Sequence, residues 1–206
     1  SVAVMDAKGC ERTLTFVIAE PEQVSVEIVL NFEGDDNTIV LGDSIQLAVV
    51  VSPAWDSLDQ IIWTPEGVVP CDTCQVQWVS PVQETTYSIM VDEGGCTDSD
   101  QVTVYVSKDR AVYVPNAFSP NGDGTNERFM IFGGSGIKEI KSFLVFNRWG
   151  ETVYEYHNFQ PNNPAYGWDG THRGKPMDPA VFTWFADVEF IDGKIIHFEG
   201  DVTLMR

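Results

Sequence analysis

Apolar side chains alternate with polar ones in short runs along almost the whole chain, and turn-forming residues separate these runs. Alternation places every second side chain on the same face of an extended strand, so one face of a sheet is buried. The clearest runs cover residues 24–30, 44–50, 86–91, 102–106 and 181–190. The apolar spacing of three or four residues that an amphipathic helix needs does not recur over a useful length. The sequence therefore predicts an all-β protein.

Residues 22–107 predict an immunoglobulin-like sandwich, because several short strands follow one another with turn signals between them. One of these turns is expected in the acidic stretch 33–37. Trp63 lies on a middle strand and Tyr87 opens a late one. Both positions are typical of core residues in such a sandwich.

An internal repeat connects the first residues to this domain. The pattern Asp-x-x-Gly-Cys ends at Cys10 and again at Cys96, 86 residues later, and an alternating run follows each copy. This spacing corresponds to one sandwich domain. Residues 1–21 are therefore expected to be the tail of a preceding repeat, within a fragment of a longer string of such domains.

Residues 111–206 predict a second compact β-sandwich after a short polar linker at 107–110. Hairpin turns are expected at 148–151 and at Asp192-Gly193, with separate strands at 194–198 and 201–205. The fold class is thus a pair of tandem β-sandwiches, the first of them immunoglobulin-like. Alternation continues to the last residue, as expected of a natural C-terminus.

The net charge of −19 is concentrated in the first part of the chain. Residues 1–110 carry 4 Lys/Arg and 19 Asp/Glu, whereas residues 111–206 carry 8 and 12. Nucleic acid is excluded as a partner, because no basic stripe could displace the counterions of phosphates. An acidic surface fits an extracellular segment, either for solubility alone or for contact with divalent cations.

Four cysteines are present, and two of them form a C-x-x-C at Cys71 and Cys74. Since this pair lies among strand patterns directly after a proline, a local structural disulfide is favoured over a redox motif. A zinc site of four cysteines is disfavoured, because Cys10 and Cys96 occupy equivalent positions in different domains.

A loop rich in Gly, Asn and Asp carries oxygen-bearing side chains at alternate positions, namely Asn121, Asp123, Thr125 and Glu127. A calcium ion prefers six to eight oxygen ligands, and calcium loops use this spacing. The same loop lacks the further acidic ligands of an EF-hand, and its Asn and Gly residues suit a tight turn equally well. Calcium is the one cofactor that the sequence suggests, and a structural turn is the alternative.

Two tryptophan triplets are candidates for binding. Trp168-Asp169-Gly170 predicts either an exposed platform or, preferably, a turn in which Asp169 caps backbone amides and Trp168 covers the edge of the core. Arg148 and Trp149 predict a hairpin turn, although an exposed Arg–Trp pair is also typical of interface anchors. Catalysis is not expected, because the histidines are scattered and no H-E-x-x-H, G-x-S-x-G or P-loop is present.

Four blocks of the second domain carry a resemblance. They are Val114–Gly124, Phe146–Gly150, Trp168–Gly170 and Gly200–Leu204. In this order they resemble the gliding-motility-associated C-terminal domain, the type B C-terminal signal of Bacteroidetes type IX secretion cargo. The preceding domain resembles, more loosely, the Ig/PKD-like repeats of large surface adhesins. In those repeats a Cys often precedes the Gly that opens the second strand; here Val40 or Leu41 holds that place, which leaves Cys96 without an evident partner.

The resemblance implies a non-enzymatic segment of a surface adhesin that directs type IX secretion and stays at the outer-membrane surface. It also implies two partners, the translocon and a PorP/SprF-like outer-membrane β-barrel protein, with upstream repeats free to bind an extracellular glycan or surface ligand. The candidate recognition residues are Arg148, Trp149, Trp168, Leu204 and Arg206. The alternative functions are a carbohydrate- or matrix-binding module that uses Trp78, Trp149 or Trp168, and a passive spacer.

Overall fold

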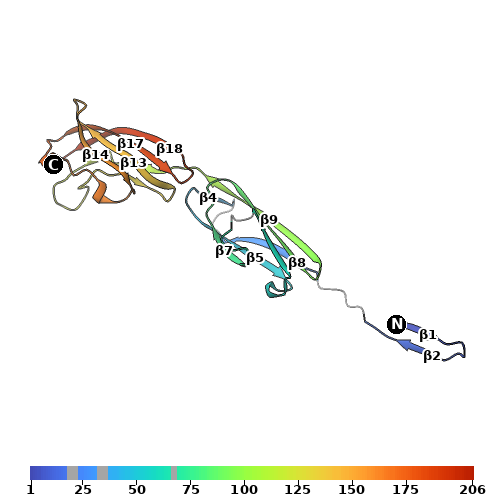
Figure 1. Cartoon of the computed structure of the whole chain (residues 1–206). Helices are drawn as coiled ribbons and strands as arrows, with labels where there is room; N and C mark the ends of the chain where they lie inside the picture. Colours follow the sequence, from blue (N-terminus) through green and yellow to red (C-terminus); the bar gives the residue numbers. More distant parts are fainter. Residues whose placement is uncertain (18–22, 32–36, 66–68) are drawn as a thin grey trace.

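The computed structural model describes residues 1–17, 23–31, 37–65 and 69–206. Along the chain, a small hairpin, a two-sheet domain and a C-terminal domain follow one another in a row (Figure 1). Across these ranges the only helical segments are two 3-10 turns, at Trp55–Ser57 and Pro164–Tyr166. None of the described helical segments is long and apolar enough to cross a membrane. The all-β prediction is confirmed.

The N-terminal hairpin consists of β1 (Val2–Met5) and β2 (Glu11–Leu14), and all of its residues are exposed. Its turn is held by Asp6, whose carboxylate accepts hydrogen bonds from the backbone N–H groups of Lys8 and Cys10. The equivalent turn of the next domain also uses an aspartate, because Asp92 accepts a bond from the N–H of Gly95. The predicted boundary between residues 21 and 22 lies outside the described residues.

The middle domain packs a three-stranded sheet, order β3-β5-β7, against a four-stranded sheet, order β4-β9-β8-β6. The strands are β3 (Ser25–Asn31), β4 (Thr38–Val40), β5 (Ile45–Ser52), β6 (Gln60–Thr64), β7 (Val76–Val79), β8 (Thr85–Glu93) and β9 (Cys96–Ser107). Trp63 and Tyr87 are buried between the sheets, as predicted. Of the predicted acidic turn, residues 33–36 lie outside the described residues.

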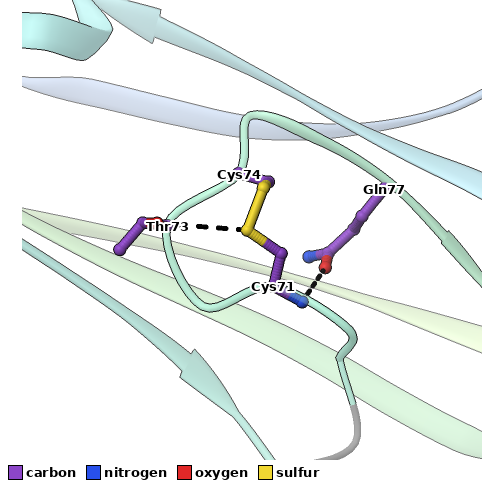
Figure 2. Close-up of a disulfide and its surroundings, with 4 residues drawn as sticks. All are labelled: Cys71, Thr73, Cys74 and Gln77. Carbon is purple, nitrogen blue, oxygen red and sulfur yellow. Dashed lines mark hydrogen bonds between the residues drawn. A yellow bond between two sulfur atoms is a disulfide. The ribbon is translucent and has the colours of Figure 1, made fainter.

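Cys71 and Cys74 are joined by a disulfide in the loop before β7, with their Cα atoms 5.4 Å apart. Figure 2 shows this loop, in which the Cys71 backbone N–H donates to the Gln77 side-chain oxygen at 3.3 Å. Cys10 and Cys96 are exposed free thiols on separate hairpins. The cysteines therefore form no shared metal site.

The C-terminal domain is built on a five-stranded sheet of order β11-β18-β17-β13-β14. Its strands are β11 (Ala117–Phe118), β13 (Ile137–Phe146), β14 (Thr152–Phe159), β17 (Ala180–Phe190) and β18 (Ile195–Leu204). Two short ladders complete the fold: β10 (Val112–Tyr113) with β12 (Phe132–Gly133), and β15 (Thr171–His172) with β16 (Lys175–Pro176). Both predicted hairpins are present, as β13–β14 and β17–β18.

Strand β18 differs from the sequence prediction, because residues 194–198 and 201–205 were expected to form separate strands. Instead one strand pairs with β17 from Ile195 to Leu204. Gly200 stays within it and lies opposite Trp184, whose indole would be 3.2 Å from a Cβ at that position. The large ring fills the space above the glycine, so the strand continues where a glycine suggests a break.

Candidate functional site

Three of the four sequence blocks that carry the family resemblance meet at one place in the C-terminal core. Phe118 of β11 pairs in parallel with Leu204 of β18, and the Met205 N–H donates to the Phe118 carbonyl at 2.9 Å. The Trp168 ring lies 5.3 Å from that of Phe118 and 4.8 Å from that of Phe182, measured between centroids. The blocks are far apart in sequence but form a single packed cluster.

The Trp168 turn is closed by its own side chains. The indole N–H of Trp168 donates to the Thr171 carbonyl at 2.8 Å. One Asp169 carboxylate oxygen accepts from both the backbone N–H and the hydroxyl of Thr171. Burial raises the pKa of Asp169, but the two hydrogen bonds from Thr171 and the nearby Arg128 charge act in the opposite direction, and the pKa is lowered. Gly170 has φ +75°, a conformation that favours glycine, and a Cβ there would make a tight contact of 3.1 Å with the Leu204 side chain.

The fourth block forms the β13–β14 turn, in which the Asn147 side-chain oxygen accepts from the backbone N–H groups of Trp149 and Glu151. The Glu151 carboxylate lies 3.3 Å from the Arg173 guanidinium and 3.5 Å from His172. Both partners directly follow the Trp168 turn. All four blocks therefore gather at one end of the domain, where β13 and β18 end. The preceding domain adjoins the opposite end (Figure 1).

The side chains at this end fall into two groups. Trp149 is 83% exposed and the Arg148 guanidinium lies 5.7 Å from its ring centroid, while Arg206 is also exposed. Trp168 and Leu204 are only 1% and 0% exposed. The prediction that Trp168 and Leu204 contact a partner directly is therefore corrected. Both side chains belong to the core, because their motifs specify packing rather than a surface. For Trp168 this agrees with the turn interpretation.

Two exposed apolar residues at this end had no signal in the sequence. Val181 and Met205 are both largely exposed, and each lies next to the end of β18. Alternation alone assigns Val181 to the outer face of β17, but the exposed faces of many strands carry single apolar residues. Only the assembled fold shows that these two residues lie at the same end as Trp149.

The loop of residues 121–127 uses its oxygens to hold its own backbone. Asn121 accepts from the N–H of Asp123, Asp123 from that of Thr125, and Glu127 from that of Gly124, at 2.7–3.0 Å. The pKa of Asp123 is lowered, first by the Thr125 amide and then by the Asn121 side chain. This geometry is that of a structural turn. Within the described ranges no group of three or more His, Cys, Asp or Glu side chains could hold a metal ion, and calcium at this loop stays a prediction.

Two of the histidines hydrogen-bond to neighbouring carboxylates. His197 lies 2.7 Å from Asp187, and this hydrogen bond lowers the pKa of that carboxyl group. The Ser142 hydroxyl donates to Asp187 as well, so it is bonded to the acid and not to the imidazole that would have to activate it. His157 bonds to Glu155 on the same strand, and this contact raises the pKa of the imidazole.

Comparison with solved structures gives distant likenesses. SGBP-B of the Bacteroides ovatus mixed-linkage glucan utilization locus, in complex with a mixed-linkage heptasaccharide, is 15% identical with a TM-score of 0.30. The match covers 98% of this chain and 51% of that chain. The immunoglobulin domains 1–5 of Sidekick-1 are 9% identical with a TM-score of 0.41, over 86% of this chain and 39% of that one. This chain thus spans about half of the first structure and less of the second.

No curated protein matches the sequence. The family of the CHU_C type IX secretion signal domain does match, over residues 112–201. This range begins at β10 and ends within β18. It contains Phe118, Trp168 and Phe182 of the packed cluster, but not Leu204. The C-terminal domain of this chain, at residues 112–201, therefore belongs to the CHU_C type IX secretion signal domain family.

Proposed function

We propose that this chain is the C-terminal segment of a gliding-motility-type adhesin, and that its last domain directs type IX secretion and holds the protein at the cell surface. The family match over residues 112–201 carries the proposal. A type IX secretion signal implies contact with the secretion machinery, export, and surface or outer-membrane association. Neither a secretion signal domain nor an immunoglobulin-like sandwich is a catalytic kind of module. The proposed membrane partner is a PorP/SprF-like β-barrel protein.

The proposed recognition surface is the end of the C-terminal domain that carries Arg148, Trp149, Val181, Met205 and Arg206. Tryptophan and arginine are the side chains that most often dominate interface energies. Because the preceding domain adjoins the other end, a passenger attached through it does not cover this surface (Figure 1). The complete chain has a net charge of −19, so exposed arginines such as Arg148 and Arg206 are the side chains suited to contact an acidic partner surface.

The first prediction concerns export. A neutral passenger fused to residues 1–206 is expected to reach the surface of a type IX-competent host that has the matching barrel protein. The same passenger fused to residues 1–107 lacks the signal domain and is expected to remain in the cell, without crossing the outer membrane. Surface labelling and protease accessibility of intact cells measure both. Retention of the complete fusion inside the cell, with the barrel protein present, would contradict the proposal.

The second prediction tests the recognition surface. Arg148→Ala with Trp149→Ala is expected to weaken capture of the purified barrel protein by about tenfold or more, because a central Trp or Arg anchor contributes at least 1–2 kcal/mol. Trp78→Ala is the matched control, since Trp78 is 58% exposed but lies on β7 of the other domain. If the wild type, the Arg148→Ala/Trp149→Ala variant and Trp78→Ala all bound the barrel protein with equal affinity, this surface would not be the recognition surface.

A carbohydrate- or matrix-binding module is the second candidate, and the exposure of Trp78 and Trp149 favours it, since an exposed indole is a suitable stacking surface for a sugar. Trp168 is removed from this candidate by its burial. A glycan array distinguishes the two functions. Binding that Trp78→Ala abolishes would support the glycan-binding module, whereas a silent array together with barrel capture would support the secretion signal.

A further inference from the structure

Leu41 lies at the tip of a β-turn of the middle domain but is only 2% exposed. The Asp43 N–H donates to the Val40 carbonyl at 2.9 Å, and Gly42 at the third position of the turn has φ +97°. These features define a type II turn, whose tip normally faces solvent. The Leu41 N–H also donates to the carbonyl of Ser107, the last residue of β9, so the turn is fixed at the end of its own domain.

The core that buries Leu41 is that of the C-terminal domain. Leu41 clusters with Ile137, Phe190 and the rest of that core, whereas Ile39 two residues earlier belongs to the core of the middle domain. Strand alternation ends at this turn, and the next large apolar side chain points into the neighbouring domain. The two hydrophobic cores therefore lie end to end, and Leu41 of the middle domain packs into the core of the C-terminal domain.

The contact around Leu41 is too close for additional atoms. A Cβ at Gly42 would lie 2.6 Å from the Ser135 carbonyl oxygen, and a Cβ at Gly136 would lie 2.6 Å from the Leu41 carbonyl oxygen. Real Cβ atoms do not approach so closely, so the backbones of the two domains touch directly at a pair of glycines. The Ser135 hydroxyl adds a hydrogen bond of 3.0 Å to the Asp43 carboxylate.

The linker between the domains is fixed as well. Arg110 forms an ion pair with Asp192 in the β17–β18 turn, and both side chains are nearly buried. The Arg110 guanidinium also lies 5.1 Å from the Phe190 ring centroid. A buried arginine with an acidic partner and an aromatic ring gives a defined geometry, unlike an exposed ion pair. A flexible linker would not need these contacts.

We propose that the turn Val40–Asp43 is an integral part of the C-terminal domain, and that Leu41 completes its core and joins the two domains into one rigid body. The stable signal domain is then larger than the matched residues 112–201. This inference does not depend on what the domain exports. The proposal also explains why a leucine, and not a cysteine, precedes Gly42. Leu41 packs into the next domain beside Ser107, at the end of β9. Cys96 lies at the start of β9, about 35 Å from Ser107 at the rise of a β-strand.

The test is native-state hydrogen exchange on the complete chain. Leu41→Ala is expected to lower the protection of the β17 and β18 amides by about a hundredfold, the size typical of a buried leucine, and to leave Tyr87 and Ile89 of the middle domain unchanged. The matched control is Leu14→Ala, because Leu14 is 57% exposed on the N-terminal hairpin and should leave both domains unchanged. Leu41→Met keeps the side-chain volume and is expected to retain most of the protection, which guards against misfolding of the alanine variant.

A second measurement addresses rigidity. Gly42→Ala is expected to separate the domains, so that small-angle scattering of the variant requires several domain orientations while the wild-type chain fits one. Unchanged β18 protection in Leu41→Ala, or a loss confined to the middle domain, would overturn the proposal. So would wild-type scattering that already requires an ensemble of orientations.

Discussion

Deletion of residues 198–206 is expected to abolish folding of the C-terminal domain. The deletion removes most of β18, which lies inside the sheet between β11 and β17. Val202 and Leu204 are fully buried, so their removal opens the core and also leaves β11 without a partner. Circular dichroism and urea titration should show the loss of the C-terminal transition while the middle domain still unfolds cooperatively.

This deletion separates folding from recognition when it is paired with a shorter one. Removal of Met205 and Arg206 alone is the matched control, because both are exposed and lie beyond the end of β18. The shorter deletion is expected to retain the fold, and any loss of barrel capture then reports on recognition. A cooperative C-terminal transition in the protein that lacks residues 198–206 would show that β18 contributes less than its burial indicates.

The fold was largely predictable because strand alternation and turn chemistry are local signals. The β13–β14 and β17–β18 hairpins and the burial of Trp63 and Tyr87 all follow from the pattern within a few residues. The continuous β18 was missed for a nonlocal reason: Trp184 from the neighbouring strand covers Gly200. A glycine that appears to end a strand in the sequence is acceptable when a cross-strand ring replaces its missing side chain.

The candidate site was harder to predict, because a characteristic sequence block can serve either to pack the core or to contact a partner, and the block itself does not show which. Trp168 and Trp149 both precede a glycine turn, yet one is buried and the other is 83% exposed. Their difference depends on Phe118 and Phe182, which come from strands distant in sequence. Leu41 was missed for the same reason, since its burial depends on a neighbouring domain and not on its own strand.

Trp168→Ala is expected to destabilise the C-terminal domain by about 4 kcal/mol, because a buried tryptophan leaves a large cavity. The variant also loses the indole hydrogen bond to the Thr171 carbonyl, which holds the turn. Trp149→Ala is expected to change the unfolding free energy by less than about 0.5 kcal/mol, since an exposed side chain contributes little packing. Urea midpoints of the complete chain measure both changes, with Trp168→Phe as a variant that keeps an aromatic ring in place.

The pair also predicts opposite effects on barrel capture. Below the urea concentration at which it unfolds, folded Trp168→Ala should still capture the barrel protein, because its recognition surface is intact. Trp149→Ala should be as stable as the wild type but deficient in capture. If instead Trp168→Ala lost capture while fully folded, the buried tryptophan would have to become exposed during recognition. The barrel protein would then bind an opened form of the domain. If Trp149→Ala captured normally, recognition would have to use another surface of the same sheet.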